Sequence, residues 1–302
     1  MAERRLRILV IANLPPFVLG GAENQSSRLI EAWLGMGAEV IAAGHSLPDG
    51  SVEVGSRVVS AMRIGVLSTA GRPIRALSYF FSMLRLVIRL RGRIDVVYCR
   101  GLGDAAISLA VLKKAGICRW PILACPINAR GSGDVAFIKS IPGWSWIAQQ
   151  LDKQIDAINL INWLVEDELC SIGIRSPKIS RIPNGIALSE PPTRTPSDVR
   201  RLVWTGRLDR QKGIDLLFHA LSKLPVGLPN WRLHLYGQGP LKSQLETLLH
   251  SLGLEDRVQL KGAIAPGEIR TILADSDAFV LPSRYEGMSN SAIEAMEAGL
   301  PV

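Results

Sequence analysis

The stretch AFVLPSRYEGMSNSAIEAM, residues 278–296, passes from a short apolar run through a polar loop into a segment of helical character. Such a run predicts a buried strand of a parallel α/β sheet, and these sheets bind ligands where their strands end. Glu286 falls in the loop, and Glu294 on the expected first turn of the helix. Backbone amides of residues 287–291 would open the helix and point at an anion. The alternative is a plain capping box, in which Glu294 bonds back to a Ser291 cap.

A second loop of this kind lies upstream, where the apolar run 201–205 is followed by GRLDRQKG, residues 206–213. Arg207 and Lys212 would then lie at the carboxyl end of a strand, within reach of the same opening as Glu286. An arginine fork and a lysine point charge suit a diphosphate whose departing charge must be neutralised. Taken alone, the loop also fits an ordinary solvated surface loop.

Glycine-containing turns follow two further expected strands. Gly20 and Gly21, before the first helix, would let the backbone approach a ligand closely, although an ordinary turn fits as well. The turn Gly237–Pro240 lacks the third glycine of a dinucleotide-binding fingerprint. We therefore expect a tight turn beside the site there.

Short apolar runs alternate with longer helical patterns along the chain, which is typical of parallel sheets covered on both faces. Prolines interrupt this pattern, so the sequence predicts a first domain over 1–188, a linker over 189–198 and a second domain over 199–302. The strands expected in the first domain are 6–12, 39–44, 95–99, 121–125, 157–161 and 179–182, with helices at 24–36, 74–90 and 104–115. Those expected in the second are strands 201–205, 231–236, 258–261 and 278–281, with helices at 214–223, 240–252, 266–274 and 291–298. Because Pro301 and Val302 look like the opening of another strand, we expect the second domain to be incomplete.

Composition narrows the class of protein. The 302 residues are 47% hydrophobic with a net charge of +8, which excludes a disordered chain. Four cysteines without paired spacing indicate reduced thiols and a cytoplasmic location. The longest run free of charged residues, Ile8–Ala22, contains two prolines and is shorter than the roughly 18 to 20 apolar residues of a membrane span. No transmembrane helix is expected.

Residues 54–94 contain eight arginines and no carboxylate, so this part of the chain should attract anions. Apolar side chains recur within it at helical spacing: Ile74, Leu77, Phe81, Leu84 and Ile88. One interpretation is a surface helix that packs this apolar face on the sheet. The other is a basic face, Arg72 to Arg93, resting on an anionic membrane surface at the inner face of the plasma membrane. No motif that reads nucleic acid accompanies the charge, so nucleic acid is not an expected partner.

Together these residues resemble the family 4 glycosyltransferases of the GT-B fold. Four features carry the resemblance over nearly the whole chain: the Gly20-Gly21 loop, Pro183-Asn184-Gly185 before the linker, Gly206-Arg207-Leu208 with Lys212-Gly213, and Glu286 with Glu294. The resemblance implies two Rossmann-like domains facing across a cleft. It also implies a retaining, metal-independent transfer of a sugar from a UDP-sugar or GDP-sugar to an acceptor hydroxyl, without a further cofactor. The acceptor would be lipid-linked, a polysaccharide or another glycoconjugate.

The resemblance gives each matching residue a role. Arg207 and Lys212 would stabilise the diphosphate leaving group, and Glu286 would contact the donor sugar, as the three catalytic residues. Glu294 would bind the ribose hydroxyls. The other donor-binding residues expected are Gly20, Gly21, Gly206, Gly287, Met288, Ser289 and Asn290.

The sequence departs from the family in two places. Many members have a histidine soon after the strand that matches 121–125, and this chain has none there. Asn128 and Arg130 remain as the acceptor-side candidates. The second departure is the expected missing tail, which leaves open a non-catalytic paralogue that binds a nucleotide sugar without transferring it.

Other chemistries find less support in the sequence. The four histidines are scattered, with no ligands at metal spacing, so no metal site is predicted. Serine hydrolase, P-loop and dinucleotide-binding glycine motifs do not occur, which disfavours hydrolases, ATPases and Rossmann oxidoreductases.

Overall fold

The chain folds into two compact units, Met1–Asn184 and Gly185–Val302, in a computed structural model. The structure describes residues 4–18, 20–67, 69, 71–129, 131, 133–190, 198–225, 228 and 230–302. Most of the linker expected over 189–198 therefore lies outside the described residues. None of the helices in these ranges combines the length and the apolar character that crossing a membrane requires.

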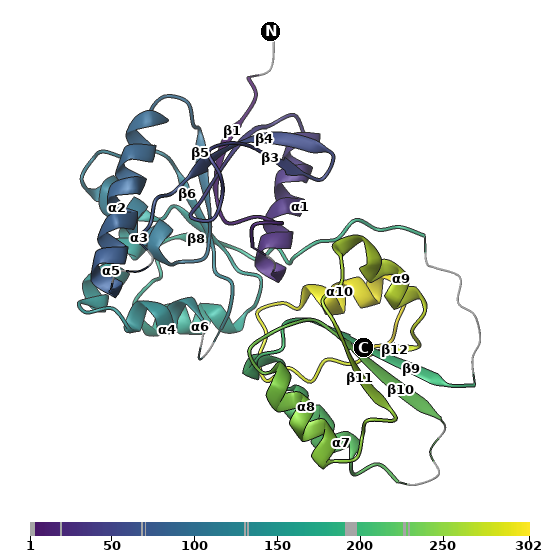
Figure 1. Ribbon diagram of the computed structural model, residues 1–302. Helices are drawn as coiled ribbons and strands as arrows, with labels where there is room; N and C mark the ends of the chain where they lie inside the picture. The colour runs from purple at the N-terminus through teal and green to yellow at the C-terminus, as the bar shows by residue number, and fades with distance from the viewer. Residues whose placement is uncertain are drawn as a thin grey trace. The chain divides into compact units, whose positions relative to one another are not determined.

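The first unit is an α/β layer structure (Figure 1). Its elements are β1 (Arg7–Ile11), α1 (Gly21–Gly35), β2 (Glu39–Gly44), β3 (Gly50–Val54), β4 (Arg57–Arg63), α2 (Arg72–Arg89), β5 (Val96–Arg100), α3 (Asp104–Lys114), β6 (Ile122–Cys125), α4 (Asp134–Lys139), α5 (Trp144–Gln154), β7 (Ala157–Asn159), α6 (Leu164–Ser171) and β8 (Lys178–Ser180). The strands pair in the order β3-β4-β2-β1-β5-β6-β7-β8, and only β3 runs antiparallel to its neighbour in this described sheet. The chain thus leaves β1 toward β2 first and returns to its other side with β5.

Side chains of β1 alternate between two apolar cores, one on each face of the sheet. Ile8 and Val10 pack with Ile30 of α1, whereas Leu9 and Ile11 pack with residues of α2, α3 and α5. Figure 1 shows α1 on one side of the sheet and α2, α3 and α5 on the other. Successive side chains of a strand point to opposite faces, so residues 8–11 of β1 must all be apolar to be buried on both sides.

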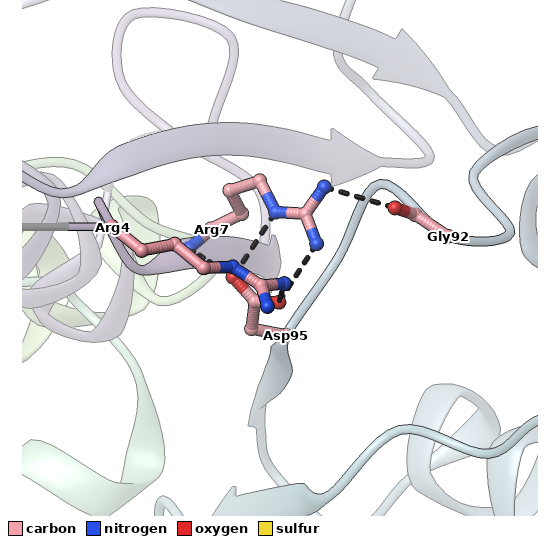
Figure 2. Close-up of polar contacts among 4 residues, drawn as sticks. All are labelled: Arg4, Arg7, Gly92 and Asp95. Atoms are coloured by element: carbon pink, nitrogen blue, oxygen red, sulfur yellow. Dashed lines mark hydrogen bonds and ion pairs between the residues drawn. The ribbon is translucent and has the colours of Figure 1, made fainter. Parts of the chain in front are cut away.

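An ionic clamp holds the amino ends of β1 and β5 together (Figure 2). The Arg7 guanidinium donates to both carboxylate oxygens of Asp95, over 3.0 and 2.8 Å, and also to the carbonyl of Gly92 at 2.9 Å. The backbone N–H of Arg7 and the side chain of Arg4 donate to the same carboxylate. These hydrogen bonds from Arg7 hold the pKa of Asp95 well below its ordinary value.

The second unit carries its own sheet. Its elements are β9 (Arg200–Thr205), a 3-10 turn at Arg210–Lys212, α7 (Ile214–Leu221), β10 (Trp231–Tyr236), α8 (Lys242–Ser251), β11 (Val258–Gly262), a 3-10 turn at Pro266–Glu268, α9 (Ile269–Ala274), β12 (Ala278–Phe279) and α10 (Asn290–Glu297). The described strands pair in parallel in the order β11-β10-β9-β12. Trp204 of β9 packs with α7 and α8, and the adjacent Val203 packs with α9 and α10. The α/β class predicted from the sequence is therefore confirmed in both units.

Most of the apolar residues at helical spacing in the arginine-rich segment 54–94 do not pack on the sheet, although one interpretation of the sequence predicts that they do. Ile74, Leu77, Phe81 and Ile88 are 50 to 60% exposed, while Leu84 is half-buried. The face of α2 that packs on the sheet consists of other residues: Tyr79, Met83, Leu86 and Val87. The interpretation of a helix that packs the Ile74 face on the sheet is therefore wrong, because α2 is apolar on two sides and the second one meets the core.

Candidate functional site

In the second unit, the loops that follow β9 and β12 are joined by backbone contacts. The Arg284 N–H donates to the Gln211 carbonyl at 2.8 Å, and the Gln211 amide donates to the Tyr285 carbonyl at 3.0 Å. Gly213 lies beneath the second loop with a φ of +64°, and a Cβ there would overlap the carbonyl oxygen of Pro282. Only glycine combines that backbone conformation with so close an approach.

The two loops bring Lys212 and Glu286 into direct contact. The Lys212 Nζ donates to Glu286 Oε1 at 2.6 Å, and each side chain is 19% exposed. The Ser283 hydroxyl donates to the same oxygen at 2.7 Å. A lysine and a carboxylate predicted from separate motifs thus form one charge pair at the carboxyl end of the sheet.

A second ion pair braces the same loops. Arg284 donates to both oxygens of Asp215 at 2.7 and 2.6 Å, and to the carbonyl of Arg210 at 2.9 Å. Hydrogen bonds from Arg284 hold the pKa of Asp215 below its ordinary value. Sequence reasoning missed this pair, although Arg284 lies in the loop after β12 and Asp215 lies in the first turn of α7, after the other loop.

Glycines let the turn after β10 pack on the loop after β9. A Cβ on Gly237 would overlap the carbonyl of Gly206, and one on Gly239 would overlap the carbonyl of Leu208. The Leu208 N–H donates to the carbonyl of Gln238 at 2.9 Å. A Cβ on Gly206 would lie 2.9 Å from the Trp204 ring. The turn at 237–240 is thus a tight one, packed against the loop that carries Lys212.

The remaining candidates of the second unit lie in the same two loops and in α10. The Arg207 side chain is 72% exposed, and its guanidinium approaches Asp209 at 3.8 Å. Helix α10 is capped by Ser289, whose hydroxyl accepts from the Ala292 N–H at 3.3 Å. The expected Ser291 cap is wrong, and Glu294 lies in the second turn, beyond reach of a capping box. Gly287, Met288, Ser289 and Asn290 form the entry to α10.

The first unit contains a cavity of about 220 Å³ at the carboxyl ends of β1, β2 and β5. It lies where the chain switches from one side of β1 to the other, the position at which open α/β sheets bind ligands. Its polar lining comes from several elements: Asn13, Glu23, His45, Arg75, Arg100 and Asp104. Gly20 and Gly21 begin α1 just before the lining residues Ala22 and Glu23.

The polar groups of this cavity hold one another in place. Asn13 accepts from the Ser46 N–H at 3.1 Å, which turns its amide nitrogen toward the ring of His45 at 3.2 Å. Partial burial lowers the pKa of His45, and Arg75 lowers it further. Burial raises the pKa of Asp104, although Arg75 and His45 oppose this. The cavity therefore offers a neutral imidazole, a carboxyl and guanidinium groups, which suits a hydroxyl-rich or anionic ligand.

Sequence reasoning missed most of this lining. Ile127 lines the cavity, whereas the expected Asn128 is not among the lining residues, and Arg130 lies outside the described residues. Ligands bind where the strands of such sheets end, so the sequence at and after the ends of β2 and β5 could have indicated His45, Arg100 and Asp104 as candidates, but not Glu23 and Arg75, which lie within helices. Across the part of the chain that the structure describes, no group of three or more His, Cys, Asp or Glu side chains could hold a metal ion.

Comparison with known proteins gives a consistent picture. Residues 188–302 match the family model described as "Glycosyl transferases group 1". The chain is 27% identical, over 99% of its length, to a phosphatidylinositol N-acetylglucosaminyltransferase subunit from Arabidopsis thaliana, of which it covers 67%. It is 41% identical, over 32% of its length, to the mannosylfructose-phosphate synthase of Agrobacterium fabrum, of which it covers 23%. The chain thus spans only part of the length of each of these relatives.

Among solved structures, Alr3699/HepE of Anabaena in complex with UDP-glucose superimposes with a TM-score of 0.71 at 18% identity. The alignment covers 99% of this chain and 80% of that one. At this identity the similarity shows the fold alone. The predicted fold class and the resemblance to glycosyltransferases of the GT-B fold are both confirmed.

Proposed function

We propose, from the match of residues 188–302 to the group 1 glycosyl transferases, that the chain is a retaining glycosyltransferase using a UDP-sugar or GDP-sugar donor. The observation that carries the proposal is the Lys212–Glu286 pair at 2.6 Å, held between the loops after β9 and β12. The acceptor is a hydroxyl of a glycan or a lipid-linked glycoconjugate. The free, mostly buried cysteines fit a cytoplasmic enzyme.

The arrangement supports loss of a diphosphate leaving group. Cleaving the bond between sugar and phosphate builds negative charge on the diphosphate, and fixed cations stabilise that charge. A lysine ammonium has three donors, so Lys212 can stay bonded to Glu286 and still donate to a phosphate oxygen. Arg207, exposed at the same loop, is free to turn toward the ligand. No metal ion is needed in this scheme.

The glutamates recognise the donor's hydroxyls. Glu286, already fixed by Lys212 and Ser283, accepts from hydroxyls of the donor sugar. Glu294, in the second turn of α10, accepts from the ribose. The amides from Gly287 to Asn290 open that helix, where its dipole favours an anion. Gly206, whose missing side chain leaves space for the Trp204 ring, offers its backbone to the donor.

We assign the acceptor to the cavity of the first unit. Its carboxyl, imidazole and guanidinium groups can donate to and accept from a polyhydroxylated molecule. His45, at the end of β2, stands in for the histidine that the sequence lacks after β6. Arg75 and Arg100 would favour an acceptor that carries a negative charge.

Isothermal titration of the full chain with UDP and with GDP tests the donor site, with a thermal melt as the check on folding. We expect micromolar binding of one nucleotide, lost in Glu294→Ala and weakened in Lys212→Ala. Exposed Lys223 supplies the matched control, because Lys223→Ala removes a charge on the same unit away from these loops. A folded chain that binds neither nucleotide contradicts the donor site.

Transfer is tested by release of the nucleotide from the donor that binds. Loss of the Lys212 charge should slow it about 100-fold or more, as for removal of one group that stabilises developing charge. Nucleotide binding without any transfer would favour the non-catalytic paralogue instead.

A further inference from the structure

Helix α2 has an apolar face that the fold does not use. Four large side chains on it, Ile74, Leu77, Phe81 and Ile88, are 50 to 60% exposed. Their spacing of three, four and seven residues places them in one stripe along the helix. Scattered exposed apolar residues need no explanation, but a continuous stripe of this kind indicates a contact surface.

The stripe is part of a rigid surface. The opposite side of α2 is locked into the core by Tyr79, Met83 and Leu86, so the helix does not depend on a partner to form. The preceding loop is fastened to it, because Ser82 donates to the Gly65 carbonyl at 2.8 Å and Ser78 accepts from the Leu67 N–H at 3.1 Å. This places Leu67, itself 57% exposed, beside the helix.

Arginines border the stripe. Arg85 lies four residues after Phe81 and three before Ile88, and Arg89 lies one turn beyond Arg85. Both are exposed. The whole segment from 54 to 94 contains eight arginines and no carboxylate. The apolar side chains and the positive charge thus occupy adjoining sides of one helix.

We propose that this surface of α2 docks on an anionic lipid bilayer, with the stripe in the headgroup boundary and the arginines on lipid phosphates. Amphipathic helices that lie on membranes combine these two features, and their affinity rises with apolar area and with charge on anionic lipid. A second copy of this chain fits less well, since self-association would bring two such arginine clusters together. This inference stands apart from the proposed catalytic site, which lies in the other unit.

Sedimentation of the full chain with vesicles tests the proposal. The vesicles are pure phosphatidylcholine, or phosphatidylcholine with about one third phosphatidylglycerol. We expect binding only to the anionic vesicles, weakened when salt screens the charge. The double variant Leu77→Ser/Phe81→Ser removes apolar area from the stripe, and the double variant Arg85→Gln/Arg89→Gln removes two positive charges beside it. Each double variant should bind anionic vesicles about tenfold or more weakly.

Matched controls come from exposed residues elsewhere. Met36, 85% exposed at the end of α1, gives Met36→Ser, and Arg232 on β10 gives Arg232→Gln; both should bind vesicles as the unaltered chain does. The proposal is wrong if the unaltered chain leaves anionic vesicles unbound, or if both double variants bind undiminished. It is also wrong if Leu77→Ser/Phe81→Ser splits a dimer, by light scattering, without affecting vesicle binding. Titration of the same variants with UDP and GDP reports the donor site separately, because neither double variant touches it.

Discussion

Two ion pairs in the second unit differ in how many hydrogen-bond donors of the cation they use. The Arg284 guanidinium donates to both oxygens of Asp215 and to a backbone carbonyl, so it holds two loops together. Lys212 donates to Glu286 through one contact, and an ammonium has three donors, so the proposed contact with a ligand phosphate does not require this ion pair to break. The planar guanidinium thus suits a brace between the two loops, whereas the lysine ammonium suits the binding role that we propose for Lys212.

The Asp95 carboxylate leads to a pH prediction. Its pKa in the folded chain is held below the ordinary 3.8, chiefly by hydrogen bonds from Arg7. The stabilisation is complete above that ordinary value and is lost progressively as the pH falls from it toward the lower pKa of the folded chain, because the unfolded chain takes up the proton first. Asp95→Asn should therefore lower the melting temperature by a few degrees at neutral pH.

The same variant should lose less stability than the unaltered chain between about pH 5 and pH 3. Urea titrations across that range measure this. Glu53→Gln is the control, because Glu53 is an exposed carboxyl on β3 of the same unit. Parallel pH profiles for Asp95→Asn and the unaltered chain would show that the clamp in Figure 2 does not stabilise the fold.

At the scale of elements, Gly213 joins the loop after β9 to α7. Its φ of +64° disfavours any residue with a Cβ, and that Cβ would also overlap the Pro282 carbonyl. Gly253, after α8, has a φ of +63° with no atom within 4 Å of the added Cβ. The two positions share the backbone conformation and differ in the contact.

Gly253→Ala should cost about 1 to 2 kcal/mol of unfolding free energy, from the left-handed backbone alone. Gly213→Ala adds the displacement of the loop after β12, so it should cost more and also weaken nucleotide binding. Urea unfolding and nucleotide titration of both variants check this. Equal losses of stability, with binding intact in both, would mean that the loops do not need their close approach.

The sequence predicts best those elements in which one hydrophobic pattern is clear. Strand β9 contains an apolar run and strands β10 and β11 alternate apolar with polar residues; each is found where expected, within one residue at either end. The β3–β4 hairpin was not predicted, although Val52 and Val54 alternate with polar residues before a turn at Gly55, whose φ is +58°. Helix α2 is expected, but the side it buries is not, because periodicity reveals apolar faces without telling which one meets the core.

At the scale of the whole molecule, the candidate sites differ in how far sequence could predict them. Lys212 and Glu286 each follow a strand of one parallel sheet, so their meeting follows from the rule that such strands end at one edge. His45, Arg75 and Asp104 come together only because β1 lies between β2 and β5, and because α2 packs at that end. Strand order is set by tertiary packing, which one sequence does not display.

Each unit has its own buried cores, those of the first built on β1 and those of the second on β9. A nucleotide that binds the second unit should therefore stabilise that unit selectively, by about 2.7 kcal/mol at a hundredfold excess over its Kd. Hydrogen exchange with and without the nucleotide measures this. Exchange should slow in the loops 206–213 and 283–290 and in β9 and β10, while β1 and β5 keep their rates. The reason is that a bound ligand raises the free energy only of those opening reactions in which it must first dissociate. Equal slowing of β1, β5 and β9 would show that the chain unfolds as one cooperative body, despite its separate cores.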